Sequence, residues 1–228
     1  TMANSIPSIT MYKRDFGTCG IANSRWTFPR IRQPKVAGSS NDERIVGGVT
    51  AQPGQWPWVV SLTYDGDAKC GASLLTERYL LTAAHCFRDR PDASRWAANL
   101  GSLDFLRPNE PGEQHIRLAR VRIHPNHGLR SRDDFDVAVL ELSSPVAYSD
   151  KIRPICVSEL PPRSGERCTV AGWGLTFFTA PYNLLNQVTV PVIRGSRCNS
   201  SDYPDLAGRI TDSMFCAGYP QGGRDACD

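Results

Sequence analysis

Short runs of apolar residues, each ended by glycine, proline, asparagine or aspartate, recur along the chain from residue 56 onward. These runs predict β-strands, because they are rich in aromatic and β-branched residues and no long amphipathic helix competes with them. The run 58–64 leads into Asp65-Gly66, a strong signal for a hairpin turn. We predict strands near residues 58–64, 72–75, 79–82, 116–123, 137–142, 169–173, 188–193 and 214–217. Many short strands with turn signals predict an all-β sandwich or barrel.

Residues 1–44 differ from the rest of the chain. They are polar, are interrupted by proline and glycine, and show no sustained period, so we expect an extended leader or linker. Cys19 suggests that this leader is attached to another part of the protein. At its end, Arg44 is followed abruptly by Ile45-Val46-Gly47-Gly48. This junction is either a processing site or a flexible turn into a strand, and the local sequence alone slightly favours the turn.

The composition excludes several classes of protein. The chain has 228 residues, of which 40% are hydrophobic, so it is long enough for one large domain or two small ones with a real core. The net charge is +3, and the arginines are mixed with acids. Nucleic acid or an anionic membrane is therefore not the expected partner.

Eight cysteines are many for this length. They lie far apart and lack the paired spacing of a zinc site, so they favour disulfides in an oxidising compartment and a secreted, extracellular protein. No signal peptide is visible, and the chain begins with threonine; either a signal was removed or the sequence starts within a longer protein. The uncharged segment 168–193 is broken by Gly, Pro, Asn and Gln, so it predicts no membrane span.

A short, uncharged run, residues 80–84, is followed directly by His85 and Cys86. An imidazole can activate a hydroxyl or thiol nucleophile near neutral pH, and Cys86 could pin the loop of His85 to a neighbouring strand through a disulfide. A histidine that is merely packed in a loop is the alternative. Asp134 and Asp136 stand at the mouth of the apolar run 137–140, where a carboxylate could orient an imidazole. A turn acid that caps a strand is the commoner role for a lone aspartate.

We assign no catalytic or metal-binding role to the other three histidines. His124-Pro125-Asn126-His127 looks like a surface turn, and His115 lies apart. Four scattered histidines do not form a metal cluster, so we expect neither a metal nor a cofactor.

The end of the chain carries two further candidates. Asn199 begins an Asn-Ser-Ser glycosylation sequon, which is typical of a surface position in a secreted protein. Asp225 lies among glycines between Cys216 and Cys227, which suggests a constrained loop, although an ordinary turn with an exposed aspartate has the same pattern.

Taken together, these pieces resemble the chymotrypsin-like (trypsin-type) serine proteases of the S1 family. The matching stretches follow the order of the family across residues 45–228. They are Arg44-Ile45-Val46-Gly47-Gly48, Trp56-Pro57-Trp58, Leu81-Thr82-Ala83-Ala84-His85-Cys86, Asp134-Phe135-Asp136-Val137-Ala138-Val139-Leu140, Cys168-Thr169-Val170-Ala171-Gly172-Trp173-Gly174, Met214-Phe215-Cys216-Ala217-Gly218 and Gly222-Gly223-Arg224-Asp225-Ala226-Cys227.

The resemblance implies an all-β, trypsin-like double β-barrel formed by residues 45–228, with residues 1–44 as a pro-segment. His85 matches the general base and Asp136 the acid that orients it, whereas Asp134 does not match the catalytic position. Asp225 matches the acid of the specificity pocket in members that cleave after Arg or Lys. The bond between Arg44 and Ile45 matches the activation site of the zymogen.

The resemblance also implies a disulfide framework. It pairs Cys70 with Cys86, Cys198 with Cys216, and Cys19 with Cys156, the last of which would tether the leader after cleavage. Cys168 and Cys227 stay unpaired here, because their family partners lie nearer a C-terminus that this sequence does not contain. Some relatives bind calcium in a loop of the first barrel, but Ser102 replaces their acid, so we expect no calcium site.

The sequence departs from the family at one decisive place. It stops at Asp228, just before the stretch Gly-Asp-Ser-Gly-Gly-Pro that carries the nucleophilic serine, and no other Gly-x-Ser-x-Gly occurs. We therefore expect an incomplete second barrel and a fragment that is inactive by itself. The favoured hypothesis is a secreted serine endopeptidase, cut short here, that acts on protein substrates and meets an activating protease and a protein inhibitor. The alternative is a naturally truncated, non-catalytic homologue that serves as a binding or regulatory module.

Overall fold

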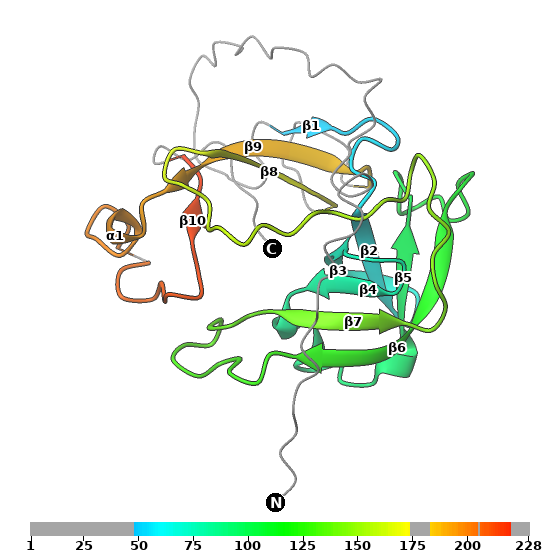
Figure 1. Ribbon diagram of the computed structural model, residues 1–228, viewed down its shortest axis with the longest axis horizontal. Coiled ribbons are helices and arrows are strands. Elements are labelled where there is room, and N and C mark those ends of the chain that lie inside the picture. Colours follow the sequence, from blue (N-terminus) through cyan, green and yellow to red (C-terminus); the bar gives the residue numbers. More distant parts are fainter. Residues whose placement is uncertain (1–47, 174–182, 205, 220–228) are drawn as a thin grey trace, which may run out of the picture.

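The computed structural model describes residues 48–173, 183–204 and 206–219. Its regular structure is almost entirely β-strand, which confirms the predicted all-β class (Figure 1). The helical elements are short: the 3-10 helices η1 (Ala84–Phe87) and η2 (Ala93–Arg95), and α1 (Gly195–Cys198). None of the helices in these ranges is long and apolar enough to cross a membrane. The strands are β1 (Val49–Thr50), β2 (Val59–Tyr64), β3 (Asp67–Leu74), β4 (Tyr79–Thr82), β5 (Trp96–Leu100), β6 (Gln114–Ile123), β7 (Ala138–Leu142), β8 (Arg167–Gly172), β9 (Asn186–Ile193) and β10 (Cys216–Ala217).

The first half of the described chain closes into a barrel. Its strand order is β2-β3-β4-β7-β6-β5, and neighbouring strands are antiparallel. Buried and less buried side chains alternate along β5 and β7, so each strand presents one apolar face that closure removes from water. The interior is filled by large side chains such as Leu62, Leu80, Trp96 and Leu140, all fully buried. This core is the rigid support on which the loops at the barrel end are built.

The predicted hairpin turn joins β2 to β3. Tyr64 pairs with Asp67, and the two residues between them have positive φ angles, 53° at Asp65 and 91° at Gly66. Positive φ at both central positions gives the turn the twist that matches its flanking strands. The Asp-Gly prediction is therefore confirmed.

A second, four-stranded sheet is built around β9 (Figure 1). β8 pairs along one edge of β9, while β1 and β10 pair with opposite ends of its other edge. Burial alternates along β9, and Val188 and Val190 pack with Ala217 and Tyr219 in a small apolar cluster. Within the described residues this sheet stays open, so the structure shows one closed barrel and one open sheet.

Backbone and side-chain hydrogen bonds join the barrel to the second sheet. Leu185 N donates to Leu103 O at 2.7 Å, and Trp173 Nε1 donates to the same carbonyl at 3.1 Å. Trp56 Nε1 donates to Gln187 Oε1 at 2.9 Å. The two units are thus held together by polar contacts between segments far apart in the sequence.

Each of the eight predicted strand regions overlaps an observed strand. Two strands were not predicted: β1, which has two residues, and β5, which has five. Apart from its tryptophan, the sequence of β5, Trp-Ala-Ala-Asn-Leu, contains no residue with high β-propensity, and Ala and Asn are depleted in strands. It becomes a strand because β2 and β6 pair with it on both sides.

Candidate active site

His85 lies on η1, directly after β4. Its neighbours Ala84, Cys86 and Phe87 are buried in the barrel core, whereas the His85 side chain is 36% exposed. A disulfide joins Cys86 to Cys70 on β3, with the two Cα atoms 6.3 Å apart. The histidine is therefore anchored on both sides and still faces solvent, as the predicted role of Cys86 in pinning this loop requires.

Asp136 lies just before β7, and β7 pairs with β4. Because Thr82 at the end of β4 pairs with Ala138 at the start of β7, the residues that follow and precede these strands meet at one end of the barrel. The Asp136 Oδ2 atom lies 2.7 Å from His85 Nδ1, and Asp136 Oδ1 accepts the backbone N–H of His85 at 2.7 Å. Both oxygens of the Asp136 carboxylate thus form hydrogen bonds with His85, one with its backbone and one with its side chain.

Burial and hydrogen bonding act in opposite directions on Asp136. Partial burial raises the pKa of its carboxyl group, but the side-chain and backbone hydrogen bonds from His85 outweigh burial and hold the pKa below its ordinary value. The carboxylate is consequently ionised at neutral pH. An ionised acceptor on Nδ1 favours the tautomer in which Nδ1 carries the proton and Nε2 has a free lone pair. This geometry makes His85 Nε2 competent to accept a proton from a nucleophile.

His127 is the residue that the sequence analysis missed. Pro125 and Asn126 form an exposed turn as predicted, but the His127 side chain is only 15% exposed. Its Nδ1 lies 3.8 Å from Asp136 Oδ1, and its Nε2 lies 3.4 Å from Arg88 Nη2. The predicted turn is confirmed, but the His127 side chain is partly buried in it. Nothing in the local sequence signals its contact with Asp136, because this contact is made across two loops.

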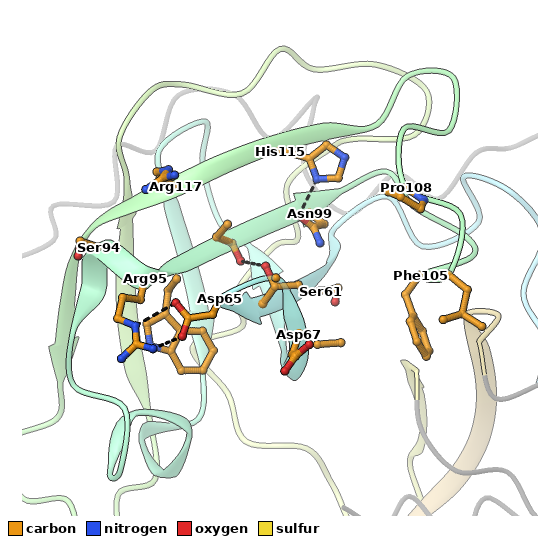
Figure 2. A pocket seen from close by; sticks show the side chains of 16 residues that line it. Ser61, Asp65, Asp67, Ser94, Arg95, Asn99, Phe105, Pro108, His115 and Arg117 are labelled. Atoms are coloured by element: carbon orange, nitrogen blue, oxygen red, sulfur yellow. Dashed lines mark hydrogen bonds and ion pairs between the residues drawn. The ribbon is translucent and has the colours of Figure 1, made fainter.

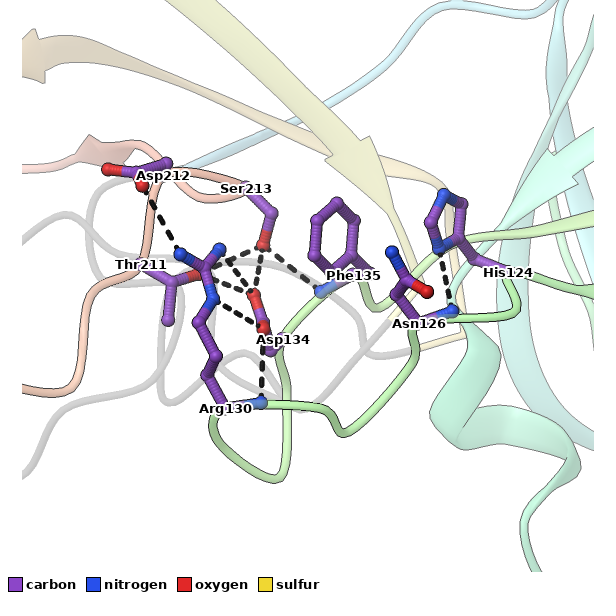
Figure 3. A network of polar contacts seen from close by, with 8 residues as sticks. All are labelled: His124, Asn126, Arg130, Asp134, Phe135, Thr211, Asp212 and Ser213. Carbon is purple, nitrogen blue, oxygen red and sulfur yellow. Dashed lines mark hydrogen bonds and ion pairs between the residues drawn. The ribbon is translucent and has the colours of Figure 1, made fainter.

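Asp134 was set apart from the catalytic position, and the structure gives it different surroundings from Asp136. Its side chain is fully buried and accepts hydrogen bonds from Arg130, Thr211 and Ser213 (Figure 3). The hydrogen bonds from Arg130, and then those from the two hydroxyls, hold the pKa of Asp134 far below its ordinary value despite desolvation. Asp134 is thus a fully paired structural carboxylate.

The described cysteines follow the framework that the resemblance implies. A disulfide joins Cys198 to Cys216, and Cys168 is a free thiol. Cys156 is disulfide-bonded, but Cys19, its predicted partner, lies outside the described residues. Predicted sites that also lie outside them are Arg44, Ile45, Asp225 and Cys227.

The sequon residue Asn199 has a structural role that the sequence did not suggest. Its Nδ2 donates to Ile210 O at 2.9 Å, and its Oδ1 accepts the backbone N–H groups of Gly208 and Ile210 at 3.1 and 3.2 Å. The residue is exposed, as the sequon interpretation requires. Its side chain also organises the loop that leads to Thr211 and Ser213.

One group of metal-ligating residue types comes together among the described residues. Suitable atoms of Cys70, His85 and Cys86 lie within 4.8 Å of one another. The two sulfurs are joined in a disulfide, however, and a disulfide provides no thiolate ligand. This group therefore does not form a thiolate metal site.

Hollows on the surface of the described residues include one away from the candidate pair and one beside it. A groove of about 900 Å³ lies on the outer side of β2, β5 and β6, where Asp65 and Arg95 form an ion pair (Figure 2). Neither His85 nor Asp136 lines this groove. A smaller hollow of about 440 Å³ is lined by Arg88, His127, Gly128 and Arg132. The smaller hollow borders the candidate active site, because His127 contacts Asp136.

Comparisons with known proteins agree with this geometry. The family model described as Trypsin matches residues 45–228. The chain is also similar to Transmembrane protease serine 9 of Rattus norvegicus, with 38% identity over an alignment of 192 residues that covers 81% of this chain. The matched part spans only 17% of that relative's length. A barrel that presents a paired histidine and aspartate, together with these two matches, shows that the chain belongs to the trypsin family of serine proteases.

Proposed function

We propose that the protein is a secreted serine endopeptidase that cleaves after Arg or Lys through a Ser-His-Asp mechanism. The observation that carries this proposal is the contact of 2.7 Å between His85 Nδ1 and Asp136 Oδ2 on a partly exposed histidine. A histidine oriented in this way by a carboxylate, on a short helix that the barrel core anchors, fits general base catalysis better than packing alone.

In the proposed mechanism, a serine hydroxyl attacks the carbonyl carbon of the scissile bond while its proton passes to His85 Nε2. Asp136 stabilises the imidazolium that forms. The C–N bond then breaks, and the leaving amine takes the proton from His85, which leaves an acyl-enzyme. Water repeats the two steps and releases the acid. These 228 residues contain no Gly-x-Ser-x-Gly stretch that could provide this serine. The proposal therefore requires that the serine lie in polypeptide that follows Asp228.

Substrate preference is proposed from Asp225. Its sequence context matches the pocket acid of family members that cleave after Arg or Lys, and a buried carboxylate would form a charge-assisted hydrogen bond with either side chain. Protein substrates follow from the family itself.

Activation is proposed at the bond between Arg44 and Ile45 by an upstream protease, with a protein inhibitor as a further partner. The leader 1–44 would stay attached through a Cys19–Cys156 disulfide. The disulfides of the described residues support an extracellular location, since such bonds persist in oxidising compartments.

The test uses the full-length protein, with and without cleavage after Arg44. Peptides that carry Arg, Lys or Phe before the scissile bond are compared by kcat/KM. We expect hydrolysis only after cleavage and only of the Arg and Lys peptides. Asp225→Asn should lower kcat/KM for these peptides, whereas Asp67→Asn, a change at a side chain that is 77% exposed, should not. Equal hydrolysis of the Phe peptide would contradict the proposed specificity.

The 228-residue chain provides a second test. Purified and cleaved, it should give no acyl-enzyme burst, because the proposed nucleophile is not among its residues. A measurable burst would show that another group acts as nucleophile. Sequencing the transcript beyond the codon of Asp228 separates the two original hypotheses. Continuation into Gly-Asp-Ser-Gly-Gly supports the protease, and a stop codon supports the non-catalytic homologue.

A further inference from the structure

The buried carboxylate of Asp134 joins two distant parts of the chain in a single hydrogen-bond network. This carboxylate accepts Arg130 Nε at 2.9 Å, Arg130 Nη2 at 3.2 Å and the Arg130 backbone N–H at 3.2 Å. On its other side it accepts the hydroxyls of Thr211 and Ser213, each at 2.7 Å. A buried charge persists only when its hydrogen-bonding capacity is satisfied in this way.

The two hydroxyls come from the part of the chain that belongs to the second sheet. Thr211 and Ser213 lie in the segment closed by the Cys198–Cys216 disulfide, just before β10 (Figure 3). Asp134 lies in the loop that leads into β7 of the barrel. The network therefore connects the second sheet to the loop that carries Asp136.

The residue between the two aspartates has an unusual backbone. Phe135 has a φ of 49°, in the left-handed region that an aromatic residue rarely adopts. Its backbone N–H donates to Ser213 Oγ at 3.0 Å, and its ring stacks on His124 with the centroids 4.7 Å apart. A conformation of this kind persists only when its surroundings hold it. Ser213 is the group that holds both Asp134 and the backbone of Phe135.

Phe135, with its left-handed backbone, lies between two aspartates whose side chains point to different partners. Asp134 points to Thr211 and Ser213, while Asp136 points to His85, where both of its oxygens accept hydrogen bonds at 2.7 Å. Relaxation of Phe135 to an ordinary negative φ would rotate the following residue and change this second contact. The position of Asp136 is thus set partly by a hydroxyl from another part of the fold.

We infer that Asp134 and Ser213 are positioning residues, which hold Asp136 against His85 by fixing Phe135 in its left-handed conformation. This inference rests on the proposed function for its kinetic consequences alone. The geometric claim concerns the contact between Asp136 and His85 and can be measured without catalysis.

The experiment compares Asp134→Asn and Ser213→Ala with two matched controls in the full-length protein. Asp212→Asn changes a carboxylate of the same network that contacts Arg130 but is 99% exposed. Ser213→Thr keeps the hydroxyl that Ser213→Ala removes. One readout is the low-field NMR signal of the proton on His85 Nδ1, and the other is the separate effect on kcat and KM.

We expect Asp134→Asn and Ser213→Ala to weaken or shift the low-field signal and to lower kcat by about 10- to 100-fold with little change in KM, as a small misplacement of a reacting group does. Asp212→Asn and Ser213→Thr should resemble the wild type. A second substitution, Phe135→Gly, should restore part of the signal in Ser213→Ala, because glycine adopts positive φ without steric cost.

Lower thermal stability with an unchanged signal and an unchanged kcat would overturn the inference, since Asp134 would then be only an anchor between the two units. If Asp134→Asn does not fold, the comparison of Ser213→Ala with Ser213→Thr tests the inference by the same readouts. A shifted signal in a protein whose wild type hydrolyses no peptide would uphold the positioning role and reject the proposed function, so the two failures are distinguishable.

Discussion

The closed barrel and the open second sheet differ in how they are stabilised. The barrel has an extensive core of fully buried aliphatic and aromatic side chains, including Leu74, Trp96 and Leu142. The core cluster of the second sheet consists of Val188 and Val190, against which Ala217 and Tyr219 pack. Val170 on β8 is 41% exposed, so this sheet covers less apolar surface within the described residues.

This difference is matched by a division of roles. The barrel places both His85 and Asp136, because paired strands β4 and β7 end and begin at the same point. The second sheet contributes through its loops, which reach the barrel at Asp134. Thus the well-packed unit carries the candidate catalytic pair, and loops of the less packed unit form hydrogen bonds with the segment that holds Asp136.

The largest expected effect concerns the pair that the barrel places. In the full-length protein, His85→Ala should lower kcat/KM by several powers of ten, because the members of a triad act as a unit. Peptide hydrolysis under matched conditions checks this, with His115→Ala as the control histidine on β6. Unchanged activity in His85→Ala would show that the base has been assigned to the wrong residue.

The same substitution in both units measures their packing directly. Val60→Ala on β2, where the side chain is fully buried in the barrel, should cost about 2–3 kcal/mol in the free energy of unfolding. Val190→Ala on β9 is 3% exposed but has fewer buried neighbours, so we expect about 1 kcal/mol. Urea unfolding of both variants checks the difference. Equal costs would mean that the two cores are equally well packed.

The junction of the units should be sensitive to acid. The pKa of Asp134 is lower in the folded chain than its value of 3.8 when unperturbed, so its contribution to stability is fully present above about pH 4 and is lost as the pH falls through the folded pKa. The free energy of unfolding of Asp134→Asn should consequently depend less on pH than that of the wild type between pH 5 and pH 2. If the free energy of unfolding changed equally with pH in both proteins, Asp134 would not contribute to the loss of stability in acid.

The smallest expected effect concerns the loop of the second sheet. Asn199→Ala removes three hydrogen bonds around residues 208–210 from an exposed position, and should cost about 1 kcal/mol. Amide hydrogen exchange of Ile210 should become faster, while exchange in β4 and β7 should not change. Faster exchange in the barrel as well would mean that the two units are less independent than their cores suggest.

Much of the barrel could be predicted from local sequence. The runs of β-branched and aromatic residues predict β2, β4, β6 and β7, and Asp65-Gly66 predicts the hairpin between β2 and β3. β5 could not be predicted in this way, because Trp96-Ala97-Ala98-Asn99-Leu100 becomes a strand only through its neighbours on both sides.

The candidate site divides in the same manner. His85 and Asp136 were candidates by residue type and were assigned their roles by the family resemblance, and the structure brings their side chains to 2.7 Å. The contacts of Asp134 and His127 could not be identified from the sequence, because their partners lie far away in the sequence or on another loop. Thr211 and Ser213, for example, are 77 and 79 residues from Asp134.

By itself, the sequence determined the strand pattern, the turn at Asp65-Gly66 and the residue types that can perform acid–base chemistry, because these depend on side-chain chemistry and on neighbours within a few residues. Residue types alone left Asp134 and Asp136 both open as the partner of His85; the resemblance favoured Asp136, and only the tertiary structure shows what turns its side chain toward His85. That orientation depends on the left-handed backbone of Phe135 and on a hydroxyl from a distant loop, since contacts between remote segments exist only once the strands have paired.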